Sequence, residues 1–135
     1  MQATNLKTNH LSAPLGMDAG TLFLSWQCAG GVRQTAYEIE VTAGAGTLWT
    51  SGKVLGSGMH TETPAAVPPK TQGQWRIRLW DENDQPGAWS EAEFETGLAQ
   101  SDWQGVWVCP ETEEPDIDCT DAINAFAKPN WEQKQ

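Results

Sequence analysis

The sequence predicts an all-β fold, an antiparallel β-sandwich of about seven strands. Short segments alternate apolar and polar residues with a period of two, and glycines and prolines separate these segments at close intervals. Eight tryptophans among 135 residues also supply large apolar side chains, which can fill the space between two facing sheets. A chain of this length suits a single domain with some additional terminal residues.

The first two predicted strands are residues 22–26 and 35–43. In the first, the alternation places Leu22, Leu24 and Trp26 on one face. In the second, apolar side chains alternate with acidic and hydroxyl side chains, which is typical of a half-buried antiparallel strand. We therefore expect each strand to turn one face toward the core.

Glycines and prolines restrict the middle of the chain. Between Gly44 and Gly58 there is room only for a short edge strand around Leu48 to Thr50. Residues 60–70 contain three prolines, which donate no backbone hydrogen bond, so this segment is expected at a sheet edge or in a loop.

Residues 74–80 and 88–97 predict a hairpin. Its first strand turns Arg76 and Arg78 toward solvent, and Trp89 is expected to pack over them. If the hairpin pairs with the preceding long strand, glutamates of both neighbouring strands lie opposite the two arginines. Such cross-strand pairs contribute about 0.2–1 kcal/mol each and favour one register. Short strands and turns in this order are typical of immunoglobulin-like and fibronectin type III-like sandwiches.

The sandwich is expected to span residues 1–108, and residues 109–135 differ from it in composition. Proline and acidic residues are frequent just after residue 108, which predicts a linker. A short helix is compatible with the residues between Thr120, as its N-cap, and Pro129, which would end it.

Charge and composition exclude several classes of partner. A net charge of −10 and an isoelectric point near 4.4 argue against nucleic acid and anionic membranes. No segment approaches the roughly 20 apolar residues of a membrane span, and the first residues lack the features of a secretory signal. Three cysteines leave at least one unpaired and match no metal-binding spacing, which favours a reducing compartment. We therefore expect a cytoplasmic location.

We expect no metal, cofactor or catalytic residue in this chain. The turn DENDQPG (81–87) carries carboxylates, but Pro86 stands where a calcium-binding loop requires glycine, so an ordinary hairpin turn is the better interpretation. Glycoside hydrolysis needs two carboxylates across a cleft, whereas the alternation turns the strand carboxylates to solvent. His10 and His60 accompany no recognisable nucleophile motif and are interpreted as surface residues.

Tryptophan has two serious interpretations, because an indole can pack in a core or stack on a sugar ring. Trp26 and Trp75 align with inward aliphatic residues and are expected in the core. Trp49, Trp80 and Trp103 are candidates for contact with carbohydrate or with another domain. Trp80 points away from the core, so we expect the C-terminal tail or a neighbouring domain to cover it, with carbohydrate stacking as the alternative.

Six segments together resemble a known family. They are APLGMD (13–18), LSW (24–26), QTAYEIEV (34–41), LWTSGKV (48–54), WRIRLWDENDQPGAWSEAEFETGL (75–98) and DWQGVWV (102–108). In this order they are similar to the N-terminal fibronectin type III-like domain of bacterial α-L-rhamnosidases, across most of residues 11–108.

The resemblance implies a non-catalytic accessory module at the front of an inverting glycoside hydrolase that releases terminal rhamnose. Its implied partners are the downstream domains of that hydrolase. The resemblance places the catalytic acids in a downstream (α/α)6 barrel, so it implies no catalytic residue here. The alternative is a carbohydrate-binding module that uses exposed tryptophans to bind rhamnose-containing carbohydrate.

Overall fold

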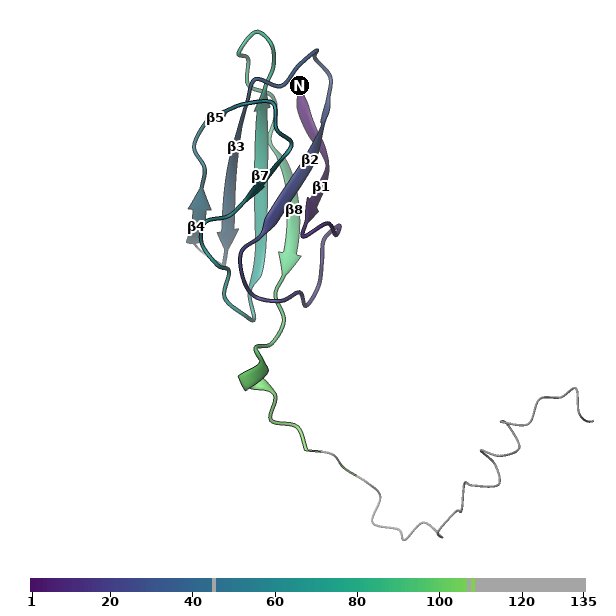
Figure 1. The fold of residues 1–135 in the computed structure, drawn as a ribbon, viewed down its shortest axis with the longest axis vertical. Coiled ribbons are helices and arrows are strands. Elements are labelled where there is room, and N and C mark those ends of the chain that lie inside the picture. The colour runs from purple at the N-terminus through teal and green to yellow at the C-terminus, as the bar shows by residue number, and fades with distance from the viewer. Residues whose placement is uncertain (45, 107, 109–135) are drawn as a thin grey trace, which may run out of the picture. The chain divides into compact units, whose positions relative to one another are not determined.

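Two antiparallel sheets face each other in the computed structural model, which describes residues 1–44, 46–106 and 108 (Figure 1). One sheet has the strand order β1–β2–β6, and the other has the order β4–β3–β7–β8, with β5 also paired to β3. A short 3-10 helix, η1, follows β8. The all-β sandwich predicted from the sequence is therefore confirmed. The elements are β1 Gln2–Thr8, β2 Phe23–Ala29, β3 Ala36–Ala43, β4 Gly46–Thr50, β5 Val54–Leu55, β6 His60–Glu62, β7 Gln72–Trp80, β8 Ser90–Glu95 and η1 Gln100–Asp102.

The compact unit that contains these elements is Met1–Gln104, which ends slightly before the expected boundary at residue 108. The linker and short helix expected within residues 109–135 lie outside the described residues. Among the residues that the structure describes, no helix is long and apolar enough to cross a membrane.

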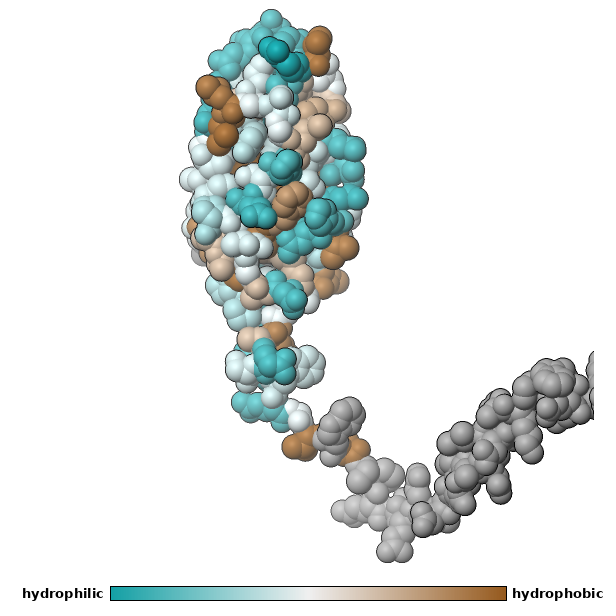
Figure 2. All heavy atoms as spheres, viewed as in Figure 1, coloured by the Kyte–Doolittle hydropathy of each residue, from teal (hydrophilic) through white to brown (hydrophobic). Residues whose placement is uncertain are grey.

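The core lies between the sheets and is formed by the strand faces that the alternation predicts. Every second residue of β2, β3 and β7 points inward, and the indole of Trp75 is completely buried. Each inward side chain loses contact with water on folding, which is the main force that holds the two sheets together. Figure 2 shows that, on one side of the sandwich, polar residues cover most of the surface and apolar residues are scattered among them. The core residues of these three strands and their flanks are Leu22, Leu24, Trp26, Ile39, Val41, Trp75, Ile77 and Leu79.

The register of β3 and β7 confirms the predicted charge pairs. Glu38 lies opposite Arg78 and Glu40 lies opposite Arg76. Each arginine forms an ion pair of 2.6 Å with the glutamate opposite it. On the other side of β7, Arg76 lies opposite Glu91 of β8. A shift of the register by one residue would separate these charges and also expose the core face.

The strand β1 was not among the predicted strands, because its sequence does not alternate. Ala3 and Thr8 are both buried although they lie an odd number of residues apart. The pairing with β2 shifts between Thr4 and Lys7, and Asn5 in this bulge has a positive φ of 48°. A bulge reverses the alternation within one strand, so a search for period-two segments does not detect it.

Candidate functional site

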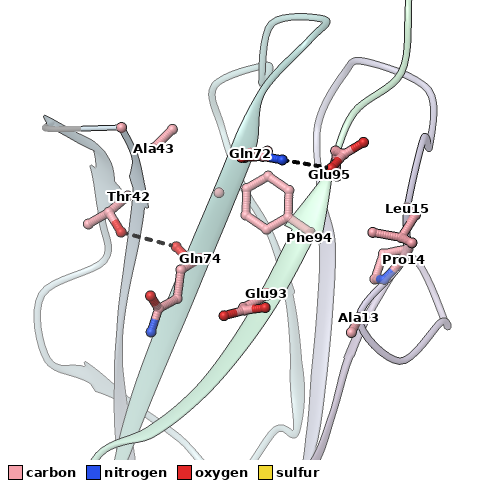
Figure 3. Close-up of a pocket in the computed structure, with 12 residues that line it drawn as sticks. Ala13, Pro14, Leu15, Thr42, Ala43, Gln72, Gln74, Glu93, Phe94 and Glu95 are labelled. Carbon is pink, nitrogen blue, oxygen red and sulfur yellow. Dashed lines mark hydrogen bonds between the residues drawn. The ribbon is translucent and has the colours of Figure 1, made fainter.

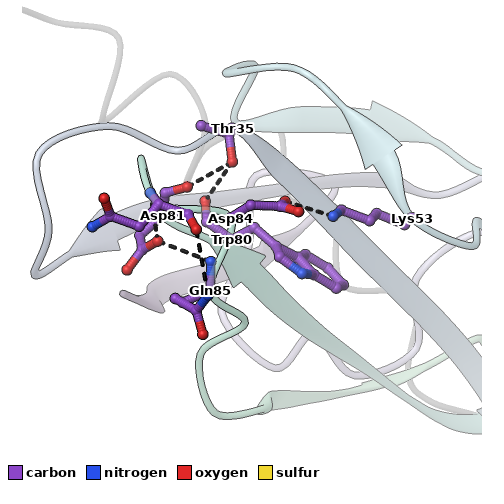
Figure 4. A network of polar contacts seen from close by, with 7 residues as sticks. Thr35, Lys53, Trp80, Asp81, Asp84 and Gln85 are labelled. Atoms are coloured by element: carbon purple, nitrogen blue, oxygen red, sulfur yellow. Dashed lines mark hydrogen bonds and ion pairs between the residues drawn. The ribbon is translucent and has the colours of Figure 1, made fainter.

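Side chains of the sandwich itself cover Trp80. The residue is only 7% exposed, although its indole points away from the core. Lys53 Nζ lies 4.8 Å from the centre of the ring and forms an ion pair of 2.6 Å with Asp84, as Figure 4 shows. The cover that we expected from the tail or from a neighbouring domain is thus supplied by residues of Met1–Gln104. The ring of Trp80 therefore offers little surface to a sugar.

Trp80 stands at one end of a column of alternating cations and indoles on the outer face of the larger sheet. The guanidinium carbon of Arg78 lies 4.9 Å from the ring centres of both Trp80 and Trp89. Arg76 lies 4.5 Å from the ring centre of Trp89, which confirms the predicted packing of this tryptophan over the arginines. Because both arginines also pair with glutamates of β3, their charges are already satisfied within this face.

The other two candidate tryptophans differ in exposure. Trp49 of β4 is half-buried and packs against the core, whereas Trp103, just after η1, is 69% exposed. Within the described residues no aromatic contact joins Trp49, Trp80 and Trp103. They lie in β4, at the end of β7 and directly after η1, and among the described residues their rings do not stack into one platform.

His10 and His60 are both exposed, as expected, but the fold brings them to the same residue. Both rings stack on one side chain, that of Phe23 in β2, with ring centres 4.8 Å away for His10 and 5.5 Å away for His60. Pairing of β6 with β2 places His60 beside this strand. Sequence reasoning missed the cluster, because the two histidines are fifty residues apart and only the sheet order unites them.

Two carboxylates of the turn 81–87, those of Asp81 and Glu82, bind backbone amides. Asp81 accepts hydrogen bonds from the N–H groups of Asn83 at 2.9 Å and of Gln85 at 3.0 Å, and the second bond is the main cause of its lowered pKa. Glu82 reaches another loop and accepts the N–H of Val32 at 3.0 Å. The turn is therefore stabilised by its own acids. In the part of the chain that the structure describes, no three metal-ligating side chains form a cluster.

Two adjoining hollows lie at the end of the sandwich where β8 finishes. The first has a volume of about 430 Å³ and is bordered by Leu15, Glu93 and Phe94 (Figure 3). The second is bordered by Leu98, and the two share lining residues at the ends of β3, β7 and β8. Their lining offers carboxylates, amides and apolar surface without a nucleophile held by a base, which suits binding and not bond cleavage. The shared residues are Ala43, Gly44, Gln72 and Glu95.

Comparison of the sequence with known proteins matches residues 3–100 to the family described as Rha78A-like, N-terminal immunoglobulin domain. A curated α-L-rhamnosidase of Streptomyces avermitilis is 34% identical over 134 aligned residues, which cover 87% of this chain and 13% of that protein. An α-L-rhamnosidase of Alteromonas sp. is 29% identical over 109 residues, covering 70% of this chain and 12% of that protein. The chain thus spans only a small part of the length of these relatives.

Solved structures agree with this match. The α-L-rhamnosidase from Dictyoglumus thermophilum superimposes with a TM-score of 0.71 and 29% identity, covering 77% of this chain and 13% of that one. The Streptomyces avermitilis enzyme complexed with L-rhamnose gives a TM-score of 0.64 and 32% identity, covering 76% of this chain and 11% of that one. A human fibronectin type III domain with 13% identity and a TM-score of 0.52 supports the fold alone. The chain therefore belongs to the Rha78A-like N-terminal immunoglobulin domain family, as a non-catalytic accessory domain.

Proposed function

We propose that this chain is the N-terminal accessory domain of a larger α-L-rhamnosidase and packs against the domains that follow it. The family match over residues 3–100, together with the 12–13% share of the curated relatives, carries the proposal. The filled interior and the paired arginines on the outer face of the larger sheet also suit a supporting role.

A domain replacement tests the packing. This chain would replace the matching N-terminal part of the Streptomyces avermitilis relative, and the fusion would be compared with the same enzyme lacking that part. The fusion should unfold at a temperature at least about 2–4 °C higher, because contact between domains stabilises the folded state. Equal unfolding temperatures would contradict the proposal.

The 135-residue chain alone should release no nitrophenol from 4-nitrophenyl α-L-rhamnoside.

Carbohydrate binding is a second candidate, which the 69% exposure of Trp103 favours. Titration with L-rhamnose would then change the tryptophan fluorescence in a saturable way, and Trp103→Phe would abolish the change. Trp49→Phe is the matched control, because Trp49 is half-buried against the core. The accessory-domain proposal expects no saturable change.

The cytoplasmic location remains a prediction, and fractionation of the producing cells would test it.

A further inference from the structure

We infer that the end of the sandwich from which the chain leaves β8 is the surface that meets the next domain of the parent enzyme. We call this surface the exit end and define it by Leu15, Leu98 and Trp103. The inference rests on the proposed accessory function and adds to it the location of the interface and the chemistry of the partner surface.

Large apolar side chains are exposed at the exit end. Leu15 is 81% exposed, Leu98 is 52% exposed and Trp103 is 69% exposed. They come from three separate segments, which precede β2, follow β8 and follow η1. Exposed apolar residues that the fold gathers at one end of a domain are typical of a surface that another protein surface covers.

Backbone hydrogen bonds hold the two leucine segments together. The N–H of Glu95 donates to Pro14 O at 2.9 Å, and the N–H of Gly97 donates to Met17 O at 2.8 Å. Gly97 also approaches the backbone of Gly16 so closely that a Cβ on it would lie 3.0 Å from the Gly16 carbonyl oxygen. The leucines are therefore presented from a fixed backbone, which lowers the entropy lost on binding.

The position of Trp103 is also fixed. Lys70 Nζ forms an ion pair of 2.7 Å with Asp102, the last residue of η1. The other carboxylate oxygen of Asp102 accepts the N–H of Ala99 at 2.9 Å. The ion pair ties η1 to the loop before β7, and the bond from Ala99 closes the turn of η1 itself, so the backbone immediately before the exposed indole is held in place.

The charge of the exit end specifies the partner surface. The adjoining hollows between Leu15 and Leu98 contain the carboxylates of Glu93 and Glu95, and Figure 3 shows both near the ring of Phe94. The Lys70 amine at this end is already paired with Asp102. The complementary surface therefore presents apolar side chains accompanied by arginine or lysine.

The occupant is the next domain, because the residues that follow β8, up to residue 106, leave the sandwich at this end (Figure 1). The curated relatives extend far beyond the matched part, since the chain covers only 12–13% of their length. The covalent connection raises the effective concentration of the following domain near the exit end, so modest apolar contact suffices for stable packing.

Two other surfaces fit the next domain less well. On the outer face of the larger sheet, Arg76 and Arg78 already pair with glutamates and stack on indoles. At the opposite end, Val32 is 87% exposed and Leu55 is 80% exposed. Val32 lies beside the charged side chain of Glu82, whose carboxylate accepts the hydrogen bond of the Val32 backbone N–H. Val32 and Leu55 are therefore matched control positions for substitutions at the exit end. They are exposed and apolar, and the nine residues of β7 separate the two ends of the sandwich by about 30 Å.

Hydrogen exchange tests the location. Exchange would be measured on the full 135-residue chain and on the same chain fused in place of the N-terminal part of the Streptomyces avermitilis relative. Amides at the exit end, such as those of Met17 and Gly97, should exchange at least about tenfold more slowly in the fusion. Amides near Val32 should exchange at the same rate in both proteins.

Substitutions separate this inference from the proposed function. Leu15→Ser with Leu98→Ser should abolish the slower exchange, whereas Val32→Ser with Leu55→Ser should leave it intact. All four substituted residues are exposed, so the unfolding temperature of the 135-residue chain alone should stay within about 1 °C. An unchanged unfolding temperature would show that any loss of amide protection in the fusion comes from the interface and not from a failure of the domain to fold.

Protection at another surface would overturn the inference and leave the accessory function intact. Phe23, between His10 and His60 on the smaller sheet, marks the strongest competing surface. If the amides around Phe23 exchanged more slowly in the fusion and those of Met17 and Gly97 did not, the interface would lie at Phe23. Protection nowhere in the sandwich, with no gain in unfolding temperature, would contradict both this inference and the proposed function.

Discussion

The indole Nε1 of Trp75 donates a hydrogen bond of 2.9 Å to the hydroxyl oxygen of Thr8. The two residues lie on different sheets, β7 and β1, and they are 0% and 1% exposed. An indole buried without an acceptor would lose its hydrogen bond to water and destabilise the fold. Thr8 thus allows a tryptophan to fill the centre of the sandwich.

Replacing Thr8 by valine should destabilise the domain. Thr8→Val keeps the shape of the side chain but removes the acceptor, so the buried N–H of Trp75 is left without a partner. The free energy of unfolding should fall by about 1–3 kcal/mol, measured by urea denaturation. The control Thr4→Val, at an exposed hydroxyl, should change it by less than about 0.5 kcal/mol. Equal effects of the two substitutions would show that the inter-sheet bond contributes nothing.

Gln34 joins a core tryptophan to a distant loop. Its side-chain oxygen accepts hydrogen bonds from Trp26 Nε1 at 3.0 Å and from the thiol of Cys28 at 3.2 Å. Its side-chain nitrogen donates to the carbonyl oxygens of Gly56 at 3.1 Å and of Gly58 at 2.9 Å. Gln34→Met, which fills similar space without these bonds, should lower the unfolding free energy by at least about 2 kcal/mol.

Urea denaturation measures this loss, and Gln27→Met on the exposed face of β2 is the matched control. Hydrogen exchange in the loop 56–58 should also become faster in Gln34→Met, because the loop loses two anchoring bonds. If the loop keeps its protection while stability falls, Gln34 supports only the core.

Gly73 is required because the ring of Phe94 packs against its backbone. A Cβ at this position would lie 2.7 Å and 2.9 Å from two ring carbons of Phe94, which is closer than atoms pack. Gly73→Ala should therefore lower the unfolding free energy by about 1–3 kcal/mol through overpacking. Gly46→Ala should be tolerated, because no atom lies within 4 Å of its Cβ position. Adding Phe94→Leu to Gly73→Ala should recover part of the loss, and strictly additive effects would refute the clash.

The pKa of Glu82 predicts a dependence of stability on pH. The hydrogen bond from the Val32 amide is the largest cause that holds this pKa below its ordinary value of 4.5. A carboxyl whose pKa is lowered by folding stabilises the folded state above its ordinary pKa, and this contribution is lost as the pH falls through the lowered value. The stability difference between wild type and Glu82→Gln should be constant above about pH 5 and shrink below pH 4.5.

Urea denaturation between pH 3 and pH 7 would measure this difference at each pH. A difference that stays constant down to pH 3 would mean that the hydrogen bond between the two loops does not depend on the charge of Glu82. The loop that Glu82 contacts contains Val32, so the protection of its amides, expressed relative to the intrinsic exchange rate at each pH, should fall over the same pH range.

The candidate surfaces could be predicted only in part. The sequence identified the outward arginines and the tryptophan above them, because β3, β7 and β8 follow each other with regular alternation. It did not identify the exit end, because Leu15 and Leu98 lie in irregular segments, where alternation says nothing about exposure. It also did not find the cover of Trp80, since Lys53 lies in the turn between β4 and β5.

By itself the sequence determined the fold class, the inward faces of β2, β3 and β7, and the pairing of Glu38 and Glu40 with the arginines of β7. These features depend on neighbours along a strand, where a period of two assigns each side chain to a face. Only the tertiary structure decided that Thr8 accepts the hydrogen bond of Trp75 and that Phe23 lies between two histidines. Such contacts depend on how the sheets stack and where the loops cross, which no local pattern in the chain records.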